Sequence, residues 1–78
     1  MSENFAPKNR IQKLAYNIYG IDRCLNFEKE LKKDPWNVSR TTARYWWENG
    51  VTTGMKLIYL KIISGFFGVT IDELTRDM

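Results

Sequence analysis

Apolar side chains recur at helical spacing from residue 8 onward. Four of them fall at positions i, i+3, i+4 and i+7, which is one stripe of an amphipathic helix. Glycine at position 20 is a natural stop for such a helix. The stripe consists of Ile11, Leu14, Ala15 and Ile18. The pattern therefore predicts a first helix that begins at Lys8 and ends before Gly20.

A second helix is predicted between residues 26 and 34. Asn26 is a suitable cap for its N-terminus. Glu28 and Glu30 then lie in its first turn, where the helix dipole favours negative charge. Pro35 ends this helix because the residue before a proline is disfavoured in helical conformation.

A third helix is predicted to run to Asn49 and to stop at Gly50. Two starts fit the sequence. Ser39 can act as the N-cap, which gives a helix of about ten residues. Alternatively, Asp34 caps the helix and Pro35 takes its first position. We favour the start at Ser39.

A fourth helix is predicted over Thr53 to Phe67, capped by Thr52 or Thr53 and ended by Gly68. Its apolar residues occupy a broad arc, as expected for the side that faces a core. The centre of that arc is formed by Ile58, Tyr59, Ile62, Ile63 and Phe66.

A short fifth helix is predicted after Thr70, over Ile71 to Leu74, with Glu73 placed as in a capping box. No stretch has the alternation of a β-strand. We therefore expect an all-α fold, a compact five-helix bundle over residues 8–78. Residues 1–7 are predicted to form a flexible N-terminal arm.

Composition limits the chain to one small domain. It has 78 residues, 44% of them hydrophobic, and a net charge of +3 with a sequence pI of about 9.2. Residues 1–50 contain nine Lys and Arg against six Asp and Glu, a balance of +3, whereas residues 51–78 contain three of each. The excess positive charge thus lies in the first two thirds, where a polyanion can dock.

Several classes of chemistry are disfavoured by missing residue types. The chain has no histidine and one cysteine, Cys24, so no histidine-based triad, no cysteine-based metal site and no internal disulfide can form. We expect no enzyme activity, no metal and no cofactor, and we interpret Cys24 as a small apolar residue. The sequence has neither a signal pattern nor an apolar run of membrane-spanning length, so we expect a cytoplasmic protein without a membrane partner.

The third helix is the candidate functional element. Read from Ser39, it turns Ala43 and Trp46 to one side and its arginines, Arg40 and Arg44, to the other. An α-helix fits the major groove of DNA, and arginine pairs with two acceptors of guanine. The other interpretation is an ordinary solvated helix face, since arginine and threonine are common there.

Two motifs resemble those of one known family. Val38-Ser39-Arg40 followed by Trp47-Glu48-Asn49-Gly50 is similar to the recognition helix and following turn of Cro/repressor-type, lambda-repressor-like helix-turn-helix proteins. The tail, residues 62–74, resembles the last two helices of that family. The resemblance implies a sequence-specific DNA-binding transcriptional regulator, encoded by a phage or prophage, that binds operator DNA through the helix 39–49.

On this interpretation the site residues divide into two groups that contact double-stranded DNA. The expected base contacts are Arg40, Thr41, Arg44 and Tyr45. The expected phosphate contacts are Ser39, Lys32 and Lys33.

The aromatic and apolar surplus predicts a partner protein. Trp46 fits a core position, whereas Trp36 and Trp47 fit either core or interface. The fourth helix carries more apolar surface than one small core needs, which favours a homodimer. The expected interface residues are Leu57, Leu60, Phe67 and Trp47. The alternative is that the chain covers these residues by itself.

A second function fits the same fold. The chain can be an antirepressor or modulator that binds another regulatory protein, such as another phage regulator, without contacting DNA, because a fold does not fix a function. The modest net charge and the surplus aromatic residues favour this alternative.

Overall fold

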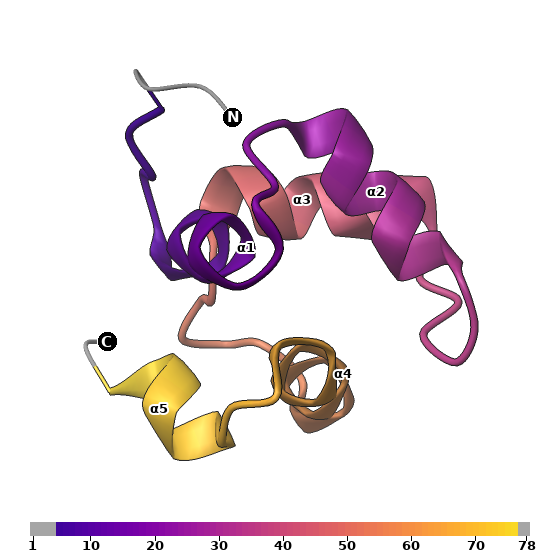
Figure 1. Ribbon diagram of the computed structural model, residues 1–78. Helices are drawn as coiled ribbons and strands as arrows, with labels where there is room; N and C mark the ends of the chain where they lie inside the picture. Colours follow the sequence, from indigo (N-terminus) through magenta and orange to yellow (C-terminus); the bar gives the residue numbers. More distant parts are fainter. Residues whose placement is uncertain (1–4, 77–78) are drawn as a thin grey trace.

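The computed structural model describes residues 5–76, and within this range the chain forms five helices and no strand. Figure 1 shows α1 and α4 nearly end-on, with α2 and α3 lying across them on one side and α5 on the other. The helices are α1 (Arg10–Tyr19), α2 (Cys24–Lys32), α3 (Arg40–Asn49), α4 (Leu57–Phe67) and α5 (Ile71–Thr75). The all-α, five-helix prediction is confirmed for these residues. The radius of gyration, 11.6 Å, is that of a compact chain of this length.

Helix α1 begins two residues later than predicted. The side chain of Asn9 accepts a hydrogen bond from the backbone N–H of Gln12 at 2.9 Å, which satisfies one of the free donors at the helix start. The predicted end is confirmed, because Gly20 takes a left-handed conformation with φ of 70°. Positive φ at this position favours glycine.

The short connection from α1 to α2 buries Ile21. The prediction that Asn26 caps α2 is wrong, because the helix begins at Cys24 with Arg23 as N-cap and no side-chain capping bond. Burying an isoleucine stabilises by about 1.5–3 kcal/mol, whereas a cap contributes about 1 kcal/mol. Burial of Ile21 in this connection is therefore large enough to outweigh the capping preference of Asn26.

The connection from α2 to α3 is a compact loop over residues 33–39. The backbone N–H of Trp36 and that of Asn37 both donate to the Lys33 carbonyl, and Val38 N–H donates to the Leu31 carbonyl. The Asp34–Pro35 peptide bond is cis, and Asn37 has a φ of 50°. Asparagine tolerates this left-handed conformation better than most residues.

The start of α3 follows the favoured prediction. The Ser39 hydroxyl accepts a hydrogen bond from the backbone N–H of Thr42, so Ser39 is the N-cap and the alternative start at Asp34 and Pro35 is wrong. The other end of α3 is attached to α1. The carbonyl of Trp47 accepts hydrogen bonds from the side-chain amides of Asn9 and Gln12, at 2.9 and 2.8 Å.

Helix α4 begins at Leu57 rather than Thr53, with Lys56 as N-cap, so the predicted caps Thr52 and Thr53 are wrong. Residues 52–55 form a turn in which Met55 N–H donates to the Thr52 carbonyl. Ile58, which we predicted at the centre of the core face, is 62% exposed. Ile63 and Phe66 are buried as predicted, and Phe67, predicted at the interface, is buried with them.

The connection before α4 also packs on the core. Val51 and Met55, which precede the helix, are half-buried against the core. The fifth helix follows the prediction, because the Thr70 hydroxyl accepts from the backbone N–H of Glu73.

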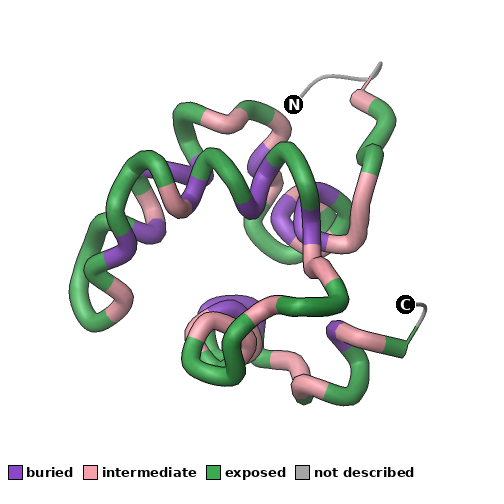
Figure 2. Tube along the Cα trace, turned by 180° about the vertical axis from the view of Figure 1, so that it is seen from behind, coloured by how far each residue is buried: buried purple, intermediate pink, exposed green. Residues whose placement is uncertain are grey.

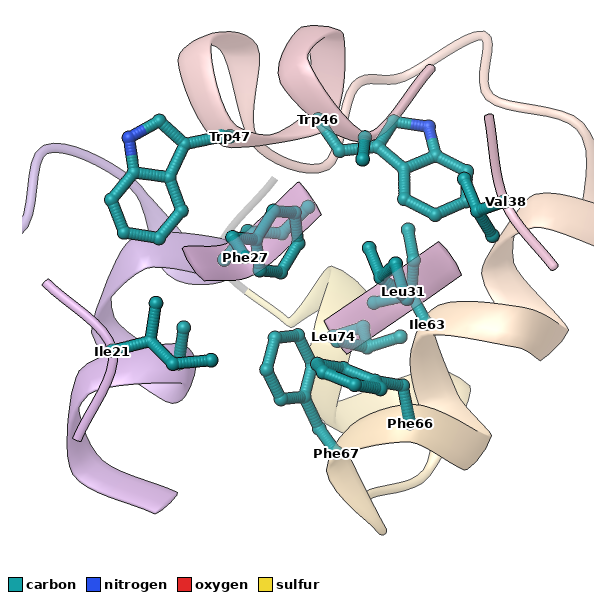
Figure 3. Close-up of a cluster of buried hydrophobic side chains, with 13 residues drawn as sticks. Ile21, Phe27, Leu31, Val38, Trp46, Trp47, Ile63, Phe66, Phe67 and Leu74 are labelled. Atoms are coloured by element: carbon teal, nitrogen blue, oxygen red, sulfur yellow. The ribbon is translucent and has the colours of Figure 1, made fainter. Parts of the chain in front are cut away.

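The core receives buried side chains from all five helices, and Figure 3 shows those of α2, α3, α4 and α5 converging. Trp46, predicted as a core residue, is 1% exposed and its ring meets that of Tyr59 edge-on. Figure 2 shows buried positions alternating with exposed ones along the helices, as amphipathic helices require. The buried hydrophobic residues are Ile11, Ala15, Ile21, Phe27, Leu31, Val38, Ala43, Trp46, Trp47, Ile63, Phe66, Phe67 and Leu74.

The predicted N-terminal arm is described from Phe5 onward, and residues 1–4 lie outside the described residues. The Phe5 ring centroid lies 5.0 Å from that of Tyr16 and 6.2 Å from that of Trp47. Phe5 thus packs against α1 and α3, and the flexibility of the segment 1–7 stays a prediction.

Candidate nucleic-acid interface

Helix α3 has one face in the core and one face in solvent. Ala43, Trp46 and Trp47 are buried against the other helices. The four predicted base-contact residues are all exposed, and their spacing places them on one side of the helix. This outer stripe of α3 consists of Arg40, Thr41, Arg44 and Tyr45.

The two arginines of the outer stripe converge on one carboxylate that comes from α2. Arg40 Nε donates to Glu28 Oε1 at 3.0 Å, and Arg44 Nε donates to Glu28 Oε2 at 3.3 Å. The Glu28 side chain is 4% exposed, whereas the Arg40 and Arg44 side chains are 70% and 52% exposed. The arginines are therefore anchored at Nε while most of each side chain stays in solvent.

Glu28 was predicted in the first turn of α2 as a helix-dipole partner, and the structure corrects this. Because α2 starts at Cys24, Glu28 lies a full turn into the helix and on its inner side, next to the buried Phe27. The sequence did hold a signal for such a carboxylate. Arg40 and Arg44 lie one helical turn apart, and a carboxylate between two such cations offsets their repulsion. Sequence alone does not show which of the nearby acids supplies it.

The hydrogen bonds around Glu28 shift the pKa values of Glu28, Arg44 and Cys24. The hydrogen bond from the Cys24 thiol, followed by the hydrogen bond and charge of Arg44 and the hydrogen bond of Arg40, lowers the pKa of Glu28 despite its burial. The hydrogen bond and charge of Glu28 raise the pKa of Arg44. Burial, followed by the hydrogen bond and charge of Glu28, raises the pKa of Cys24 to about 11. Glu28 is thus ionised and Cys24 protonated at neutral pH.

The three predicted phosphate contacts have different surroundings. The Ser39 hydroxyl is engaged with Thr42, from whose N–H it accepts and to whose hydroxyl it donates at 2.9 Å. Lys33 pairs with Glu30 at 2.9 Å in an exposed ion pair. Lys32 is exposed at the end of α2. An exposed ion pair contributes little to stability, so Lys33 can exchange Glu30 for another anion.

The outer stripe of α3 borders two hollows in the surface. Arg40, Thr41 and Arg44 line a shallow hollow of about 310 Å³. Thr41 and Tyr45 also border a mostly apolar groove of about 420 Å³, which α3 shares with the 52–56 connection. Donors and apolar surface therefore lie side by side on the outer stripe, as base edges and thymine methyl groups require.

Of the four residues predicted at a partner interface, two are accessible in the fold and two are buried. Leu57 is 59% exposed and Leu60 is half-buried. Trp47 and Phe67 are covered within one chain, by the rings of Phe27 and others, and so do not form a free surface. Trp36 is half-buried against Phe66. Sequence reasoning missed Ile58, which joins Leu57 as the most exposed pair of large aliphatic side chains.

Comparisons with family models, with curated proteins and with solved structures each return no match to this chain. Within residues 5–76, no helix has the length and apolarity to cross a membrane. The same residues contain no group of three or more Cys, Asp or Glu side chains placed to hold a metal ion.

Proposed function

We propose that this chain is a sequence-specific DNA-binding transcriptional regulator of the Cro/repressor helix-turn-helix type, with α2 and α3 as the motif and α3 in the major groove. The observation that carries the proposal is the outer stripe of α3, where two anchored arginines, a threonine and a tyrosine face solvent together. Exposed residues of a recognition helix contact base edges in this way.

The chemistry of the stripe suits duplex DNA. Arginine binds guanine through two donors at once, and threonine offers a hydroxyl and a methyl group. Lys32 and Lys33, at the end of α2 that leads into the loop before α3, supply the phosphate contacts that position the helix. The proposal needs no cofactor and no catalytic step.

A salt-dependent titration tests this function. Wild-type protein is titrated with duplex DNA at several salt concentrations, and the logarithm of the binding constant is expected to fall linearly with the logarithm of salt. Lys32→Ala removes one phosphate contact, so its slope is expected to be shallower by roughly 0.9. Folded wild-type protein that binds no duplex at low salt contradicts the proposal.

A homodimer is the proposed assembly on DNA. Two-fold symmetry matches paired half-sites about one helical turn apart. Leu57 and Ile58 at the start of α4 are the exposed aliphatic pair that a second copy would cover. Sedimentation of wild type and Leu57→Glu tests this, with a dimer expected for wild type and a monomer for the variant. Wild type that stays monomeric at high micromolar concentration on and off DNA excludes it.

The same exposed pair supports a second candidate function, an antirepressor or modulator that binds another regulatory protein. Leu57 and Ile58 lie on α4, apart from the outer stripe of α3, so a protein partner can bind there without using the arginines. The DNA titration separates the two functions, because this candidate predicts no DNA binding by the isolated chain.

A further inference from the structure

Glu28 connects the two arginines of the outer stripe through both of its oxygens. The guanidinium groups come from successive turns of α3, and each donates its Nε to a different oxygen of the same carboxylate. The carboxylate is buried and the arginines are exposed. The buried carboxylate of Glu28 thus holds the Nε atoms of two arginine side chains that are largely exposed to solvent.

This anchoring leaves the terminal nitrogens of each arginine as the outward-facing donors. Arginine carries five N–H donors in a fixed planar fork, and its Nε accounts for one of them. The remaining four lie on the two terminal nitrogens, which can bind two acceptors in parallel. Anchoring at Nε also lowers the rotamer freedom that would otherwise be lost on binding.

The spacing of the two arginines sets the spacing of their targets. Arg40 and Arg44 are four residues apart, which is a rise of about 6 Å along an α-helix. Successive base pairs of DNA are about 3.4 Å apart. A helix that follows the groove therefore brings the two forks to base pairs about two steps apart.

We propose that Glu28 is a positioning residue that presents Arg40 and Arg44 to two guanines about two base-pair steps apart in one half-site. This rests on the proposed function. Glu28 does not contact a base itself, because it is buried and both of its oxygens already accept hydrogen bonds from the arginines. Guanine is the target because its O6 and N7 are the adjacent acceptors that a bidentate arginine binds.

The test selects binding sites from a random-sequence duplex library with wild-type protein and three variants. Wild type is expected to select two guanines about two steps apart, on either strand. Arg40→Lys and Arg44→Lys keep the charge and lose the fork. Each is expected to lose preference at one of the two guanines, by roughly 5- to 150-fold, with the salt dependence unchanged.

Glu28→Gln separates positioning from a purely structural role. The variant removes one negative charge, so its affinity for random duplex is expected to stay equal or rise. Its preference for the two guanines is expected to fall, because the amide NH2 that replaces one carboxylate oxygen is a donor and cannot accept the Nε–H of the arginine that faces it. A purely structural role would lower both affinities together. Thermal melting of each variant checks that the fold is retained.

The outcomes distinguish this inference from the function beneath it. Wild type that binds duplex DNA without selecting paired guanines overturns the inference and leaves the function standing. The same holds if Glu28→Gln keeps the wild-type preference, or if it loses specific and random affinity in parallel. Folded wild type that binds no DNA in any sequence overturns both.

Discussion

The inner and outer faces of α3 come from the same ten residues and have opposite chemistry. The inner face packs Ala43, Trp46 and Trp47 into the core, whereas the outer face places two arginines over a buried carboxylate. Shortening a side chain of the inner face lowers the free energy of unfolding, because a cavity remains in the core. The outer face has solvent on one side, so shortening it affects what the helix binds. Stability and recognition are therefore separable by substitution within one helix.

The largest expected effect is on the inner face. Trp46→Ala removes a buried indole and is expected to lower the free energy of unfolding by about 3–5 kcal/mol. The total free energy of unfolding of a domain is only about 5–15 kcal/mol, so this variant loses a large part of its stability. Chemical denaturation measures the change, with Trp46→Phe as the milder control. A Trp46→Ala protein with the wild-type midpoint would contradict the placement of this face.

The next effect is expected where α3 ends. Gly50 has a φ of +71°, and a Cβ placed there would lie 2.8 Å from the Cβ of Asn9. Gly50→Ala is therefore expected to destabilise by about 1–3 kcal/mol, from backbone strain and from displacement of the Asn9 cap. Gly54→Ala is the matched control, since nothing lies within 4 Å of its Cβ position. Equal melting temperatures for the two variants would disprove the close approach.

A smaller effect is expected at the N-cap, on the border between the two faces. Ser39→Ala leaves the backbone N–H of Thr42 without its side-chain acceptor and is expected to cost about 1 kcal/mol. Ser39→Asp keeps an acceptor at this position and is expected to retain most of the stability. The comparison fails if the alanine and aspartate variants unfold at the same denaturant concentration.

The smallest effect concerns reactivity beneath the outer face. Because the pKa of Cys24 is raised to about 11, its thiol is expected to be alkylated at pH 8 about tenfold more slowly than in the unfolded chain. Glu28→Gln is expected to accelerate the reaction, since it removes the neighbouring charge. The stability linked to this shift is complete below the ordinary pKa of 9.0 and is lost as pH rises through about 11. Equal alkylation rates in the folded and unfolded chains would contradict the raised pKa of Cys24.

Much of this fold is predictable from local signals, and the failures have a common cause. Ser39, Thr70 and the three helix-ending glycines Gly20, Gly50 and Gly68 act through short-range hydrogen bonds and backbone conformation, which the sequence shows directly. Asn26 has an equally good capping signal, yet tertiary packing decides that helix start instead. A local preference of about 1 kcal/mol yields where a buried side chain contributes more.

The candidate site was predictable to a similar extent. Exposure of the outer stripe follows from helical spacing, and the structure confirms it for Arg40 and Arg44. The role of Glu28 could not be predicted, because it depends on how α2 is rotated against α3. On α4 the error is confined to Ile58, which is exposed near the start of the helix, whereas Ile63 and Phe66 are buried as predicted.

The most direct test of the central claim, that the outer stripe of α3 binds DNA, compares two variants of equal net charge. One carries Arg40→Ala, Arg44→Ala and Glu28→Gln together, which removes both arginines without leaving their carboxylate unpaired. The other carries Lys61→Ala on α4. Each lowers the net charge from +3 by one. Titration against the duplex that wild type selects is expected to show a loss of about 1–3 kcal/mol per arginine in the first variant and near wild-type affinity in the second. Equal affinity of the two folded variants would contradict the claim.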